Sequence, residues 1–158
     1  MKHILRMVIP VILSFFLLFT ASPVSADAAD NAVLSRTVVD FDNGSREETT
    51  VLQYASDPAR GVITGEKIKN HYSQSRELVW RVKLTGSFTY NGTTSSCTEA
   101  HTEIYFYKSG WSVVSENTTH SGNTASTSVI LGKNVLGVTM PGAYVNLSLS
   151  CDKDGNLS

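Results

Sequence analysis

The sequence is poor in charge, proline and cysteine, and these shortages exclude several classes of protein. Charged residues make up 17% of the chain, with a formal net charge of -1, against roughly 25% charged residues in average soluble proteins. That balance excludes a strongly basic nucleic-acid-binding protein. Only 4 prolines occur, which argues against a low-complexity stalk despite the many Ser and Thr residues. The 41% of hydrophobic residues is too high for wholesale disorder.

Common catalytic motifs are also missing from the 158 residues. The chain contains no Gly-x-Ser-x-Gly, no His-Glu-x-x-His and no phosphate-binding loop. The turn from Asp152 to Asn156 resembles the opening of a calcium loop, but the chain ends too early to complete the twelve residues that such a loop needs. We therefore expect a protein that is not an enzyme and that needs no cofactor and no metal.

The first 26 residues have the three zones of a signal peptide. Lys2 and Arg6 give a positive start, Met7–Phe19 is almost continuously apolar, and Val24 and Ala26 are small residues at the positions that a signal peptidase reads. The alternative is a retained membrane anchor, but an apolar run of about 13 residues is short of the roughly 20 needed to span a bilayer. We expect cleavage after Ala26, a secreted protein of formal net charge -3, and no membrane attachment afterwards.

Export changes how the two cysteines, Cys97 and Cys151, are interpreted. In an oxidising compartment, an even number of cysteines predicts a disulfide. A loop of this length would stabilise the fold by about 4 kcal/mol in the chain-entropy model. The alternatives are two free thiols or a metal pair, but two cysteines alone cannot complete a zinc site. The sequence therefore predicts a Cys97–Cys151 disulfide.

Alternation of apolar and polar residues predicts an all-β protein. The clearest example is Trp80–Tyr90, in which Trp80, Val82 and Leu84 alternate with polar residues. The stretch 62–72 also fits a helical period loosely, but no N-cap precedes it, and a strand is favoured. The predicted strands are Val33–Phe41, Arg46–Tyr54, Val62–Tyr72, Trp80–Tyr90 and Ala143–Cys151. The predicted turns or breaks are 42–45, 55–61, Asn91-Gly92, Ser109-Gly110 and Gly122-Asn123.

These elements predict a single antiparallel β-sandwich, for which an immunoglobulin-like fold is the best-populated option. Residues 27–61 form an N-terminal hairpin and linker in this prediction, and residues 62–158 form the sandwich core. A two-residue turn at Asn91-Gly92 would pair Tyr90 with Thr93 and place Gly86 opposite Cys97. That register would bury Glu99, His101 and Glu103, so we predict a bulge, or a break in pairing, between Thr98 and Glu103 that turns Ile104 and Phe106 to the core.

Two segments carry a family resemblance. The run Trp80–Cys97 and the ending Val145–Ser158 resemble segments of small secreted β-rich proteins of Gram-positive bacteria that contain a domain of unknown function. The resemblance covers roughly residues 68 to 158. It implies export and a β fold, and it brings no catalytic residues with it.

Three aromatic residues, Tyr105, Tyr107 and Trp111, are candidates for a binding platform for a glycan or a protein. Ordinary packing between strands would use the same residues. Glu99, His101 and Glu103 share one side of an extended chain and could form a metal or acid/base site, or simply a solvated strand face.

The leading hypothesis is therefore a secreted, non-catalytic β-sandwich that binds an extracellular or cell-envelope glycan or protein. The alternative is a small extracellular hydrolase whose site is assembled from scattered residues such as His101 and Glu103. A secreted antagonist of competing cells is a third possibility, for which the sequence offers no specific feature.

Overall fold

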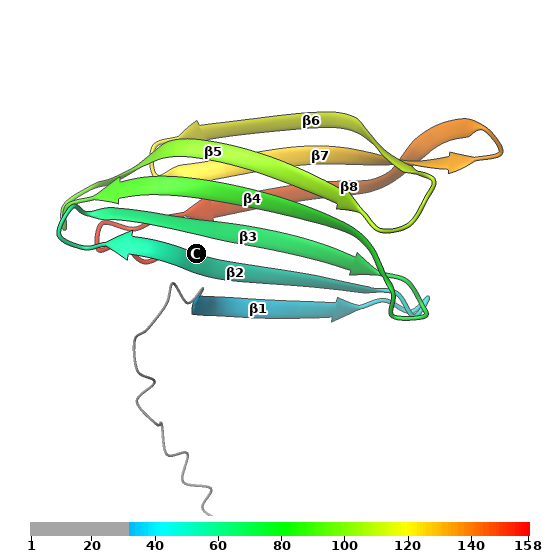
Figure 1. Ribbon diagram of the computed structural model, residues 1–158, viewed down its shortest axis with the longest axis horizontal. Helices are drawn as coiled ribbons and strands as arrows, with labels where there is room; N and C mark the ends of the chain where they lie inside the picture. The colour runs from blue at the N-terminus through cyan, green and yellow to red at the C-terminus, as the bar shows by residue number, and fades with distance from the viewer. Residues whose placement is uncertain (1–31) are drawn as a thin grey trace, which may run out of the picture.

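The computed structural model describes residues 32–158, which form eight β-strands joined by turns. All neighbouring strands pair antiparallel, in a five-stranded sheet of order β1-β2-β3-β4-β5 and a three-stranded sheet of order β6-β7-β8 (Figure 1). The strands are β1 (Ala32–Asp40), β2 (Arg46–Asp57), β3 (Val62–Tyr72), β4 (Leu78–Tyr90), β5 (Ser95–Phe106), β6 (Trp111–Ser121), β7 (Thr124–Val135) and β8 (Val138–Ser150). The all-β prediction is confirmed. The predicted leader, residues 1–26, lies outside the described residues.

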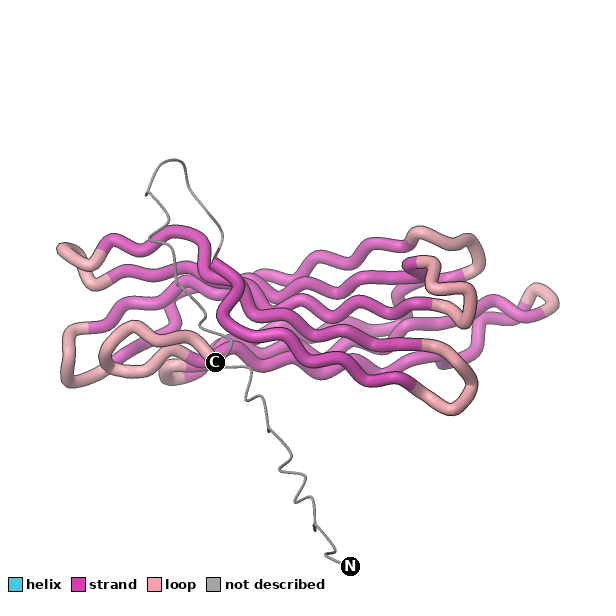
Figure 2. The backbone as a smooth tube through the Cα atoms, turned by 90° about the horizontal axis from the view of Figure 1, so that it is seen from below, coloured by secondary structure: helices cyan, strands magenta, loops and turns pink. Residues whose placement is uncertain are grey.

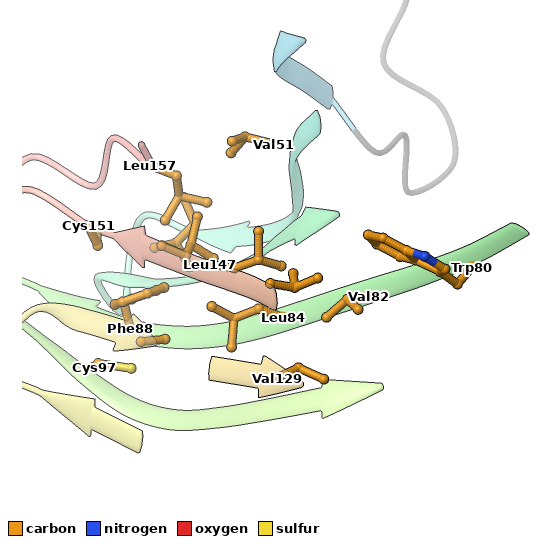
Figure 3. Packing of buried hydrophobic residues seen from close by; sticks show 14 of the residues in the cluster. Val51, Trp80, Val82, Leu84, Phe88, Cys97, Val129, Leu147, Cys151 and Leu157 are labelled. Carbon is orange, nitrogen blue, oxygen red and sulfur yellow. The ribbon is translucent and has the colours of Figure 1, made fainter. Parts of the chain in front are cut away.

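The two sheets pack face to face (Figure 2). Each strand at the centre contributes alternate residues to the layer between them. On β4, Trp80, Val82, Leu84 and Phe88 are at most 1% exposed, and they lie in a row along the strand (Figure 3). From the opposite sheet come Val129 and Leu131 of β7 and Val145, Leu147 and Leu149 of β8. Burying each such side chain stabilises the fold by about 1.5–3 kcal/mol.

The five-stranded sheet is wider than its partner. The described contacts between the sheets join β3, β4 and β5 to the three-stranded sheet, and β1 is exposed along its whole length. β2 pairs with β3 from Arg46 to Asp57, so the N-terminal hairpin continues the same sheet. The described residues contain no helix that is long and apolar enough to cross a membrane.

The predicted register of β4 and β5 is wrong by two residues next to the turn and by three residues from Ser87 onwards, where the pairing shifts. Tyr90 pairs with Ser95, so that Phe88 lies opposite Cys97 and Gly86 opposite Ala100. The reason is the side chain of Asn91, whose Oδ1 accepts hydrogen bonds from the backbone N–H groups of Thr93 and Thr94 at 3.0 and 2.9 Å. This side chain stabilises a four-residue connection where the sequence predicted a two-residue turn.

The predicted bulge occurs at the beginning of its predicted range. The register shifts after Phe88 and Cys97, so that Thr98 is not paired with a residue of β4 in the ladder, although its hydroxyl donates a hydrogen bond to the carbonyl of Ser87 at 3.1 Å. As a result, Ile104 and Phe106 lie opposite Val82 and Trp80 and pack against the core, as expected.

Gly86 does not make room for Cys97, as the sequence had suggested. A Cβ atom at Gly86 would lie 2.7 and 2.8 Å from two ring atoms of Phe88 and 3.2 Å from the Cβ of Ala125. The missing side chain therefore lets the Phe88 ring and β7 approach the strand closely.

The predicted disulfide is not formed. Cys97 and Cys151 are both free and buried, and each thiol donates to a different backbone carbonyl, that of Glu99 at 3.2 Å and that of Asp152 at 3.4 Å. Burial raises the pKa of both thiols.

The immunoglobulin-like topology is also wrong. An immunoglobulin sandwich mixes strands from distant parts of the sequence in each sheet through Greek-key connections. Within residues 32–158, every sheet neighbour is also the neighbour in sequence, and the chain passes from one sheet to the other only between β5 and β6.

Candidate functional site

The outer face of the five-stranded sheet contains a broad hollow of about 500 Å³. It lies across four adjacent strands, because residues that point away from the core on β2, β3, β4 and β5 form rows across the sheet. The hollow is lined by Thr50, Leu52, Tyr54, Glu66, Ile68, Asn70, Arg81, Lys83, Tyr105 and Tyr107. Its lining therefore combines tyrosine rings with charged and amide groups.

Two of the three predicted aromatic residues meet in this hollow. Tyr105 is 41% exposed and Tyr107 is 50% exposed, and both line one side of it. The hydroxyl of Tyr105 donates a hydrogen bond to Oε1 of Glu103 at 2.9 Å, and this bond raises the pKa of Tyr105. The contact holds the hydroxyl end of a side chain that stays partly exposed to solvent.

Trp111 does not belong to the platform. It begins β6 in the other sheet, where its ring packs edge-on against Trp80 with 6.4 Å between the ring centroids. The ammonium group of Lys133 lies 5.8 Å from the Trp111 ring centroid. Trp111 is therefore part of the packing at the end of the core.

A buried carboxylate, Glu66, organises the polar side of the hollow. It is 5% exposed, accepts a hydrogen bond from the hydroxyl of Tyr54, and accepts another from Thr85 at 3.2 Å. The Nζ of Lys83 lies 3.1 Å from Glu66 Oε1 and also contacts Glu103. These contacts supply the partners that a buried carboxylate requires.

The same contacts shift three pKa values. Burial, followed by the hydrogen bond to Glu66, raises the pKa of Tyr54 to about 12. Partial burial lowers the pKa of Lys83, but its bonds to Glu103 and Glu66 outweigh this and raise it overall. The bond from Lys83 lowers the pKa of Glu103. Lys83 and Glu103 are thus both charged at neutral pH.

A second hollow of about 380 Å³ lies on the same outer face, nearer to β1. Its cations are already paired: Arg36 with Glu48 at 2.6 Å, and both Arg46 and Arg76 with Asp40 at 2.8 Å. The hydrogen bonds from Arg46 and Arg76 lower the pKa of Asp40 to about 2. Because Arg46 and Arg76 share the carboxylate of Asp40, three guanidinium groups are paired with two carboxylates, and one net positive charge remains.

The residues proposed for metal or acid/base chemistry lie along the outer face of β5. Glu99, His101 and Glu103 are opposite Ser87, Thr85 and Lys83 on β4. Among residues 32–158, no three His, Cys, Asp or Glu side chains are placed to hold a metal ion. Glu103 is held ionised by Lys83, and is therefore poorly suited to donate a proton at neutral pH.

Most of the hollow was not identified from the sequence. Arg81 and Lys83 alternate in the sequence with Trp80, Val82 and Leu84, and this pattern by itself predicts that they face solvent. Tyr54, Glu66 and Asn70 come from β2 and β3, and their position beside β4 depends on the register between strands.

Comparisons of the chain with protein-family models, with curated proteins and with solved structures gave no match.

Proposed function

We propose that the chain is an exported, non-catalytic binding protein that binds an extracellular glycan in the hollow on the outer face of its five-stranded sheet. Export rests on the signal-peptide pattern of residues 1–26. The observation that carries the binding proposal is the hollow itself, in which two exposed tyrosines stand beside fixed polar groups.

A glycan fits this arrangement better than a compact apolar ligand. Sugar rings have an apolar C–H face, which packs on an aromatic ring, and hydroxyl edges, which need hydrogen-bond partners. Tyr105 and Tyr107 supply the rings, and Thr50, Asn70 and Arg81 supply donors and acceptors. The hollow is broad and spans four strands, as suits an extended oligosaccharide.

The proposal is tested by screening the protein without its leader against a glycan array, followed by titration of each hit. Tyr105→Ala and Tyr107→Ala should each weaken binding by about tenfold, because a partly exposed aromatic contact contributes on the order of 1–1.5 kcal/mol. Tyr144→Ala is the matched control, since Tyr144 is 69% exposed on β8 of the other sheet. It should bind as the wild type does.

Two results would count against glycan binding. One is a blank array together with a blank pull-down of cell-envelope glycans at high protein concentration. The other is an equal loss of affinity in Tyr144→Ala and Tyr105→Ala. If a hydrolytic activity were measured and lost in a folded His101→Ala variant, the enzyme hypothesis would replace this one.

A further inference from the structure

The contacts of Arg81 indicate which kind of glycan the hollow binds. This inference rests on the proposed glycan-binding function. We propose that the hollow prefers glycans that carry an anionic group, a carboxylate or a phosphate, and that the guanidinium of Arg81 binds that group. The step from a general glycan to an anionic one depends on how Arg81 is held.

Arg81 is held by one edge only. It lies on the outer face of β4, with Asn70 on one side and Tyr105 on the other as its cross-strand partners. Its Nε donates a hydrogen bond to Oδ1 of Asn70 at 2.8 Å, and Asn70 is 6% exposed. Among residues 32–158 no other side-chain hydrogen bond and no ion pair involves Arg81, so its two terminal nitrogens keep their donors for a ligand.

The neighbouring carboxylates on this face are already paired with other cations. Glu48, which lies across Asn70 from Arg81, pairs with Arg36. Glu66 and Glu103 share the single cation Lys83, so these three groups together carry one net negative charge. None of the described carboxylates forms an ion pair with Arg81, so the proposed preference depends on the free N–H groups of Arg81 and not on an excess of positive charge in the hollow.

The free edge of a guanidinium matches a planar or tetrahedral oxyanion. Two parallel N–H groups bind a carboxylate or a phosphate in a bidentate manner, and such charge-assisted bonds are roughly twice as strong as neutral ones. Because Asn70 fixes the Nε side of the group, less freedom is lost when the anion binds. A sugar ring packed on Tyr105 would bring its charged substituent beside Arg81, since directly paired residues are about 5 Å apart at Cβ.

The test compares three probes by isothermal titration at low salt: tetragalacturonate, which carries carboxylates; a glycerol phosphate oligomer, which carries phosphates; and neutral chitotetraose. We expect at least one anionic probe to bind about tenfold more tightly than chitotetraose, and this preference to shrink as salt screens the charge. The two anionic probes separate a carboxylate source from a phosphate source.

The decisive variant is Arg81→Gln, which should abolish the preference: the ratio of the affinities for the anionic probe and for chitotetraose should fall from about tenfold to about one, even if the affinity for chitotetraose also falls. Arg60→Gln is the matched control, because it removes the same charge from an exposed turn outside the hollow. Glu103→Gln should act in the opposite sense and raise the affinity for the anionic probe, while its amide oxygen can still accept from Tyr105. Circular dichroism and thermal melting establish that each variant is folded. If Arg81→Gln fails to fold, the proposal is tested by two other measurements: the preference for the anionic probe should shrink as salt is added, and Glu103→Gln should bind that probe more tightly than the wild type does.

Equal binding of all three probes by the wild type, or a preference that survives in folded Arg81→Gln, would overturn the anionic specificity while leaving glycan binding intact. Binding of none of the three probes would instead count against glycan binding itself, and the specificity would fall with it.

Discussion

At the scale of single residues, Lys83 links the stability of the sheet to the proposed site. It is the cation beside Glu66, a carboxylate that is almost fully withdrawn from water. Removing one partner of such a pair leaves a buried charge uncompensated, which costs more than the pair itself contributes. The hollow and the folded state therefore depend on the same ion pair.

We expect Lys83→Met to lower the free energy of unfolding by about 2 kcal/mol at pH 7, less than the 3–5 kcal/mol of a fully buried pair because Lys83 is partly exposed. Urea denaturation measures this value. The matched control is Lys153→Met, whose partner Asp154 is exposed, and which should cost less than about 0.5 kcal/mol. Similar losses in the two variants would contradict the role assigned to Glu66.

Tyr54 gives a prediction at alkaline pH. The folded protein holds the phenolic proton more tightly than the unfolded chain does, since the pKa rises from 10 to about 12. The stability that this group contributes is therefore fully present below pH 10 and is lost as the pH rises from 10 to 12. Tyr54→Phe should show a smaller loss over the same interval in denaturation curves. An unchanged pH profile would contradict the Tyr54–Glu66 hydrogen bond.

The two cysteines should behave as slow thiols. Because both are buried and burial raises the pKa of each, the native protein should react with a thiol reagent much more slowly than the unfolded protein. Two thiols should titrate in denaturant without added reductant. Finding none under those conditions would contradict the free thiols and restore the disulfide that the sequence predicted.

At the scale of elements, the alternation of apolar and polar residues predicted correctly which side chains of a strand face the core. It did not predict which residues of neighbouring strands pair. The polar and apolar residues of β4 and of Ala143–Cys151 lie on the sides expected from the sequence, because a strand buries every second residue. The pairing of β4 with β5 depended instead on a single side chain, Asn91, that lengthens the turn. Sequence spacing does not reveal that hydrogen bond.

The prediction that Trp111 belongs to the aromatic platform is wrong for a related reason. Tyr107 and Trp111 are four residues apart, but the chain changes sheets between β5 and β6, so the two rings serve different layers. Which connection leaves a sheet is decided by packing between layers, and the local pattern of residues carries no signal for it.

The β7–β8 hairpin, which extends beyond the other strands (Figure 1), gives a prediction about its turn. Leu136 is 99% exposed and has a φ of 53°, in the left-handed region that Asn adopts more readily than Leu. Leu136→Asn should therefore raise the free energy of unfolding by about 0.5–1 kcal/mol. Leu136→Ala keeps the unfavourable backbone and should gain little. A thermal melt in which Leu136→Asn is less stable than the wild type would contradict the strain assigned to this turn.

At the scale of the whole molecule, the two sheets have different roles. The three-stranded sheet covers the apolar face of β3, β4 and β5, and this leaves the opposite face of those strands to form the hollow. A rigid sheet holds side chains from distant parts of the sequence at fixed spacing, as a binding site requires. The outer face of the five-stranded sheet is therefore the surface on which we propose that the glycan binds.

The most direct test of this account is to map the bound ligand on the protein by NMR. Backbone amide shifts are followed in isotope-labelled protein while a glycan identified on the array is added. We predict that the shifted amides cluster on β3, β4 and β5, around Glu66, Arg81 and Tyr105. Shifts confined to β6, β7 and β8 would show that the ligand binds elsewhere and would contradict the account.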